Sequence, residues 1–344
     1  MKRYFFTFIV FFFFLFSTTA ESDSKSLFHF SIKPLYSFEY GTLNEFVYSK
    51  DSDQNIYKLS ELNWTVKNHS IGLSADWGVK WLSFCSSFSY GLNGPSGNMY
   101  DSDWQDRSNH SIKTEYSISD NTLNTFSNLE LSLLGRIPLT PESISKTFSV
   151  TYIPSIKYCN SYYNFSAKDA EGWYGSSIYT NLDYPVPYNS PNAKHFLKGE
   201  LMGIDYKREH QILFFGEGVK LQFYERLNLF VNFDISIFSI IESVDTHYTN
   251  KERTLGTDYR DTMTGYFNII KISSAIDYQF NKKLYIGANY IFTYQALTTG
   301  NTQSKNHTLD EYYLLKNSFA GSSGMTHNFS IYLKYALDDL YFIY

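Results

Sequence analysis

The chain has 344 residues, with 29 Lys and Arg against 34 Asp and Glu and a formal net charge of −5 at pH 7. This acidic balance argues against nucleic acid as a partner, and two cysteines, Cys85 and Cys159, are too few for a disulfide scaffold. Aromatic residues make up 19% of the chain, yet its mean hydropathy is −0.30. Few soluble domains combine these properties, whereas outer-membrane β-barrels need aromatic girdles around a polar lumen.

The N-terminus has the pattern of an export signal. Lys2 and Arg3 are basic, residues 4–16 form an apolar core, and residues 17–20 (Ser-Thr-Thr-Ala) supply small side chains for cleavage. The apolar core is too short to span a bilayer as a helix. We therefore expect residues 1–20 to be a signal peptide and residues 21–344 to form a single β-barrel domain. Its two cysteines are expected to be inert thiols, with a disulfide between them as the alternative.

Apolar and polar residues alternate along much of the remaining chain, which predicts β-strands. The alternation is clear at residues 227–237, 284–292 and 329–337. One face of each such strand suits lipid and the other a polar interior. Ten strands are predicted, at residues 27–40, 56–77, 79–93, 122–136, 147–166, 198–224, 227–245, 265–280, 283–298 and 326–337.

The predicted connections alternate in length. Short connections are expected around Gly78, residues 137–146, residues 225–226 and residues 281–282. Long ones are expected at residues 41–55, 94–121, 167–197, 246–264 and 299–325. This pattern predicts an all-β protein of the cell outer membrane, a ten-stranded antiparallel transmembrane β-barrel with long extracellular loops and short periplasmic turns.

Two short stretches with carboxylates fall at the predicted outer rim. Asp101 and Asp103 lie two residues apart, as do Asp245 and His247. In extended backbone such pairs point to the same face, so each stretch offers two polar groups aimed one way. His247 can accept a proton near neutral pH with Asp245 orienting it, while Asp101 and Asp103 could hold or polarise a water molecule.

Two other interpretations of these four residues stay open. All four could be solvated loop residues, as charged loop residues generally are. They could also take a divalent ion, although the sequence has no HExxH motif, no CxxC motif and no close pair of histidines. No serine or cysteine stands in a nucleophile-elbow context, so direct attack by water is the simpler chemistry.

Four segments of the chain resemble the omptins, a family of ten-stranded outer-membrane endoproteases of the aspartyl type. They are Gly97-Asn98-Met99-Tyr100-Asp101-Ser102-Asp103-Trp104, Asp245-Thr246-His247-Tyr248, Tyr57-Lys58-Leu59-Ser60-Glu61-Leu62-Asn63-Trp64, and Gly300-Asn301-Thr302 with Leu333-Lys334-Tyr335. The resemblance implies that Asp245 and His247 activate the attacking water, while Asp101 and Asp103 hold it and stabilise the oxyanion. It also implies peptide or protein substrates cleaved near basic residues, with no cofactor and no metal.

The resemblance extends less completely to substrate choice. Glu45 lines up with a family glutamate that binds the P1 side chain. The acidic residue expected two positions before Asp245 is Ser243 instead, and Glu242 should point to the other face of the strand. Because a guanidinium needs a full set of carboxylate partners, we expect a basic P1 preference that is relaxed toward Lys or other residues.

Outer-membrane lipid is an expected partner, but activation by lipopolysaccharide is doubtful. The family's lipid clamp has a Tyr-x-Glu-x-Arg pattern on the fifth strand, whereas residues 158–162 here read Tyr-Cys-Asn-Ser-Tyr. Tyr162 cannot replace an Arg as a bidentate phosphate ligand. The altered loops and the missing carboxylate at Ser243 leave a second function open, that of a non-catalytic barrel acting as an adhesin or receptor. A porin is third, since a closed ten-stranded barrel leaves little room for a wide channel.

Overall fold

The computed structural model describes residues 28–338 apart from 52, 80, 107 and 142–146. The expected signal peptide and the C-terminal tail after Asp338 lie outside the described residues. The strands are β1 (His29–Lys50), β2 (Ile56–Val79), β3 (Leu82–Leu92), β4 (Gly94–Asp103), β5 (Glu115–Gly135), β6 (Ile137–Pro138), β7 (Phe148–Tyr174), β8 (Lys194–Leu201), β9 (Ile204–Phe223), β10 (Leu227–Tyr248), β11 (Gly256–Gly265), β12 (Ile269–Gln279), β13 (Leu284–Asn306) and β14 (Tyr313–Asp338). No helix in this part of the chain is long and apolar enough to cross a membrane.

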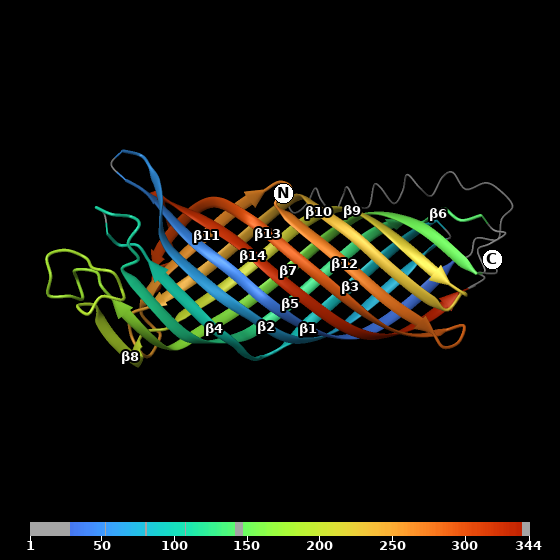
Figure 1. Cartoon of the computed structure of the whole chain (residues 1–344), viewed down its shortest axis with the longest axis horizontal. Helices are drawn as coiled ribbons and strands as arrows, with labels where there is room; N and C mark the ends of the chain where they lie inside the picture. The colour runs from blue at the N-terminus through green and yellow to red at the C-terminus, as the bar shows by residue number, and fades with distance from the viewer. Residues whose placement is uncertain (1–27, 52, 80, 107, 142–146, 339–344) are drawn as a thin grey trace.

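The strands form one antiparallel sheet that closes on itself. Strand β14 pairs with β1, and β1 pairs with β2. Strands β5, β7, β9 and β10 pair in that order on the far side of the ring, and β13 pairs with β14. Strands β3 and β4 both lie between β2 and β5, and β11 and β12 both lie between β10 and β13. The result is a ring of ten strands, and the all-β antiparallel class is confirmed. Figure 1 shows the strands crossing the long axis of this ring at a steep tilt.

The outer face of the ring carries an apolar belt. Large apolar side chains are exposed at alternate positions, among them Ile32, Tyr36, Tyr40, Ile71, Leu73, Val231, Phe233, Ile272, Ile276, Phe329, Ile331 and Leu333. The residues between them face inward and are mostly small or polar, as with Ser31, Ser37 and Glu39 on β1. An apolar surface of this extent is too large for a water-exposed monomer, so the belt needs an apolar surrounding.

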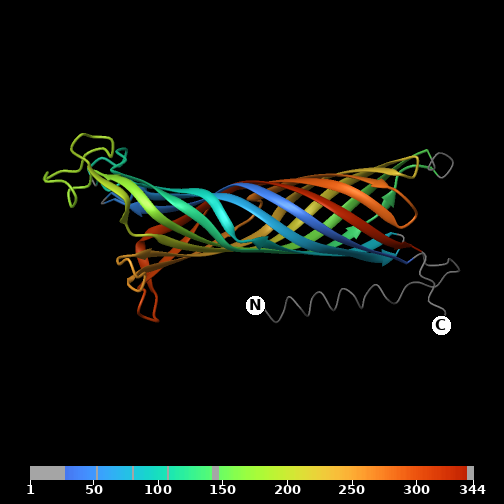
Figure 2. The same ribbon diagram turned by 90° about the horizontal axis from the view of Figure 1, so that it is seen from below.

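The strands continue beyond the belt at one end of the ring. β1 was expected to end at residue 40 and runs to Lys50, while β4 and β11 occupy segments that were expected to be loops. There the outer face of a strand is no longer apolar, so the alternation that predicts strands disappears although the backbone pairing continues. The described chain ends lie at the opposite end, where His29 pairs with Asp338 (Figure 2).

The largest buried apolar cluster lies inside the ring just below this extended end. It contains Leu43, Leu62, Trp64, Val66, Met99, Leu123, Phe126, Tyr163, Phe165, Ala167, Ile204 and Tyr206. Trp64 stacks on Tyr206 with ring centroids 5.0 Å apart and also packs on Phe165 at 5.6 Å. The cluster excludes water from the interior at this depth, so polar groups directly above it lie against an apolar floor.

Candidate active site

Asp245 and His247 lie on the inner face of β10 near its end. The distance between His247 Nε2 and Asp245 Oδ2 is 2.6 Å. The Asp245 side chain is only 4% exposed, whereas the His247 side chain is 40% exposed. Asp245 therefore contacts Nε2 of the imidazole from a buried position, while the His247 side chain itself is partly exposed.

Asp101 and Asp103 lie on the inner face of β4, on the other side of the lumen. Their strand begins with a bulge between Pro95 and Asn98, where Gly97 takes a φ of +85° that favours glycine. Asp103 is the last residue of β4, and Asp101 Oδ1 is buried with no hydrogen-bond partner among the described residues. Asp101 therefore has an acceptor free for a molecule in the lumen.

Asp101, Asp103 and His247 have shifted pKa values because of burial and of the charges around them, including that of Asp245. Burial raises the pKa of Asp101 to about 6, against the lowering effect of His247. Burial also raises the pKa of Asp103 well above its usual value, and the charge of Asp101 adds to this. For His247 burial lowers the pKa, but Asp245, Asp101 and Asp103 outweigh it and raise the pKa to about 9. The structure thus brings the two sequence-predicted pairs together around one space.

Glu45 lies on β1, in the same cross-strand row as Asp101, because Leu62 of β2 is opposite both residues. It is 2% exposed. Burial raises the pKa of the Glu45 carboxyl, and the charges of Asp245 and Asp261 raise it further. The residue that is predicted to bind the P1 side chain is therefore electrostatically linked to the predicted catalytic Asp245.

Asp261 is a site residue that the sequence did not reveal. It lies on β11, is 1% exposed, and is close enough to Glu45 for its charge to raise the pKa of that carboxyl. Burial and the charge of Asp245 raise the pKa of Asp261 to about 7. Its segment was expected to be a loop, and only the cross-strand pairing of Asp261 with Ser243 places it in the site.

Ser243 and Glu242 occupy the faces that their positions predict. Ser243 is buried on the inner face of β10, two residues below Asp245, whereas the Glu242 side chain is exposed on the outer face. Glu242 therefore cannot replace the carboxylate that is missing at Ser243. This expectation from strand geometry is confirmed.

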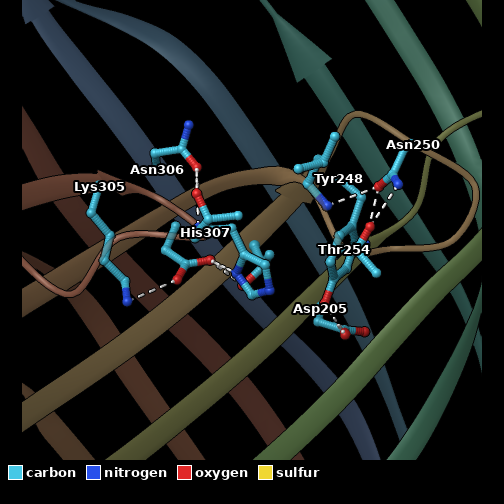
Figure 3. A network of polar contacts seen from close by, with 11 residues as sticks. Asp205, Tyr248, Asn250, Thr254, Lys305, Asn306 and His307 are labelled. Carbon is cyan, nitrogen blue, oxygen red and sulfur yellow. Dashed lines mark hydrogen bonds and ion pairs between the residues drawn. The ribbon is translucent and has the colours of Figure 1, made fainter.

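A separate polar network holds the end of β10 from the outside (Figure 3). Thr246 Oγ1 donates to Asp258 Oδ1 at 2.8 Å, and His307 Nδ1 is 2.7 Å from the same oxygen. Tyr248 donates its hydroxyl to Asp205 Oδ2 at 2.8 Å. Thr246 and Tyr248 alternate with Asp245 and His247, so fixing their side chains also fixes the backbone that carries the inner pair.

Among the residues that the structure describes, no group of three or more His, Cys, Asp or Glu side chains is arranged to hold a metal ion. Cys85 and Cys159 are both free thiols, and Cys159 is buried.

Comparison with known proteins places this arrangement in a family. The model of the omptin family matches residues 37–337. The structure of outer membrane protease OmpT from Escherichia coli superposes with a TM-score of 0.73 at 21% identity, covering 93% of this chain and 100% of that one. The structure of Neisserial surface protein A superposes with a TM-score of 0.23 at 10% identity, covering 87% of this chain and 95% of that one. The translocator domain of autotransporter NalP from Neisseria meningitidis superposes with a TM-score of 0.28 at 6% identity, covering 93% of this chain and 91% of that one.

No curated protein sequence matches the chain. The family match nevertheless extends from within β1 to within β14, and the superposition with OmpT shows the same fold. The apolar belt on the outer face agrees with both the family match and the superposition. The chain belongs to the omptin family and is an outer-membrane β-barrel protein.

Proposed function

We propose that this chain is an outer-membrane endopeptidase that cleaves exposed peptides or surface proteins next to basic residues. The main observation that supports this proposal is the hydrogen-bonded Asp245–His247 pair. This pair is close enough to Asp101 and Asp103 for their charges to shift the pKa of His247. Membership of a protease family supports the reaction class. The proposed orientation places this end of the barrel outside the cell, with the chain ends and the short turns in the periplasm.

The proposed reaction is direct attack of water on the peptide carbonyl. His247, in its neutral form, takes a proton from the water as the oxygen bonds to the carbonyl carbon. Asp245 keeps the imidazole oriented and stabilises the imidazolium that forms. Asp101 and Asp103 share a proton at neutral pH, so together they can hold the water and donate a hydrogen bond to the developing oxyanion. His247 then passes its proton to the leaving amine as the C–N bond breaks.

The test is cleavage of a fluorogenic peptide with two adjacent arginines by refolded protein. Asp245→Asn and His247→Ala should each lower kcat/KM by about 10²–10⁴-fold, the usual contribution of a general base. Glu242→Gln is the matched control, because it removes a carboxylate from the same strand on the outer face. Equal rates for the parent and both site variants would refute the mechanism.

The alternative function, a non-catalytic barrel acting as an adhesin or receptor, depended partly on the missing carboxylate at Ser243. Asp261, directly across from Ser243, places a carboxyl group in that region. The acidic site is therefore not depleted in this chain, which favours the protease.

A further inference from the structure

Glu45 and Asp261 form a buried carboxyl pair beside the proposed catalytic groups. They come from β1 and β11, which are separated around the ring by β14 and β13, and their side chains meet inside the lumen. Burial and nearby carboxylates raise the pKa of both groups, that of Asp261 to about 7, so the pair holds a proton when no ligand is bound. Two acidic side chains from strands that are not neighbours thus converge on one point.

Both carboxyls have acceptor atoms without a partner. Glu45 Oε2 and Asp261 Oδ1 are buried and accept no hydrogen bond from any described residue. None of the ion pairs in the described part of the chain includes either residue. Carboxylate oxygens buried without donors are costly, so their orientation suits a ligand that supplies N–H groups and positive charge.

The nearest buried cation does not meet this need. Arg208 is fully buried, and its charge lowers the pKa of Glu45. Its guanidinium nevertheless donates to neutral acceptors, namely His210 Nε2, Gln295 Oε1 and the backbone carbonyls of Asn44 and Ser323. Arg208 moderates the negative charge around the carboxyl pair without satisfying its free oxygens.

Strand register explains why Asp261 is the relevant residue. Ser243 of β10 pairs directly with Asp261 of β11, and both side chains face the lumen. Directly opposite side chains in an antiparallel pair have Cβ atoms about 4.5–5.5 Å apart. A carboxylate at position 261 can therefore reach the space that a carboxylate at position 243 would occupy.

We propose that Asp261, together with Glu45, binds the basic side chain next to the scissile bond and selects arginine over neutral residues. This inference rests on the proposed endopeptidase function and adds a specificity-determining residue to it. A guanidinium has five N–H donors in a fixed fork and can contact both carboxyls at once, whereas an ammonium acts as a point charge. The cation replaces the proton that the pair shares, and that proton leaves to solvent.

The test compares peptides that differ only in charge at the selected residue. Citrulline has nearly the shape of arginine but no charge, so the ratio of kcat/KM for the arginine peptide to that for the citrulline peptide isolates recognition of the cation. Asp261→Asn should lower this ratio by about 10- to 100-fold, the usual effect of losing a charged hydrogen-bond partner. Glu242→Gln should leave the ratio unchanged. An unchanged ratio in Asp261→Asn would overturn the inference.

A rescue variant and a binding measurement separate this inference from the proposed reaction. Ser243→Asp combined with Asp261→Asn moves the carboxylate one strand across and should restore most of the ratio; failure to restore it in a folded barrel counts against the inference. Fluorescence anisotropy with labelled peptides on His247→Ala protein measures selection without turnover. Tighter binding of the arginine peptide that is lost on adding Asp261→Asn supports the pocket even if no parent cleavage is seen. Equal binding of both peptides refutes it even if cleavage occurs.

Discussion

The imidazole of His247 lies among three carboxyls, and this sets the pH range in which it can act as a base. Asp245, Asp101 and Asp103 stabilise the protonated form and raise its pKa to about 9, above the ordinary value of 6.5. A general base must be unprotonated, so kcat/KM should rise with pH, with a midpoint above 6.5. A pH profile with a dibasic peptide measures this midpoint.

Asp101→Asn gives the sign of the effect. The pKa of Asp101 is about 6 and its charge raises the pKa of Asp103, so Asp101 carries the negative charge of the pair. Removing this charge near His247 destabilises the imidazolium, so the pKa of His247 falls and its basic form persists to lower pH. The midpoint of the kcat/KM profile should therefore move to lower pH in this variant, whatever happens to the maximal rate. A midpoint that stays in place or moves upward would show that another group controls the profile.

At the level of the strand, β10 carries its reactive pair on the inner face and its anchors on the outer face. Thr246→Val removes the hydroxyl that donates to Asp258 and keeps the shape of the side chain. A net hydrogen bond contributes about 0.5–1.5 kcal/mol, so we expect kcat to fall by about 3- to 10-fold while KM stays within about twofold. Thr246 is a positioning residue, and steady-state kinetics separate the two parameters.

The charges around His247 are untouched by this substitution, so the midpoint of its pH profile should match that of the parent. Tyr248→Phe is the companion variant on the same face, because it removes the hydrogen bond to Asp205. An effect of Thr246→Val confined to KM, or a shifted midpoint, would contradict a purely positioning role.

The same strands show how far the sequence predicts the structure. Alternation identified the ring strands wherever their outer face is apolar, as with Val231 and Phe233. It failed at the extended end, where the outer faces of β4 and β11 are no longer apolar and these segments were expected to be loops. The four proposed catalytic residues were found through short spacing and family resemblance. Asp261 has neither signal, because only strand register brings it to Ser243.

At the level of the whole molecule, ion pairs inside the lumen join strands far apart in sequence. Lys157 of β7 and Asp234 of β10 lie 2.9 Å apart, with side chains 8% and 0% exposed. Lys271 of β12 also pairs with Glu130 of β5, which is farther around the ring. Gly216 of β9 leaves the space that Asp234 needs, since a Cβ there would collide with its carboxylate. These pairs replace an apolar core in the narrow interior.

Replacing one partner of a buried ion pair should lower the free energy of unfolding more than replacing both partners. Lys157→Met keeps the apolar stem and leaves Asp234 charged and buried, which typically destabilises a protein by about 3–5 kcal/mol. Adding Asp234→Asn removes the unpaired charge, so the double variant should recover a large part of that loss. The free energy of unfolding in urea, followed by tryptophan fluorescence in a fixed lipid or detergent, measures both variants. A double variant less stable than Lys157→Met would mean that Asp234 holds the lumen together through its other contacts and not through this ion pair.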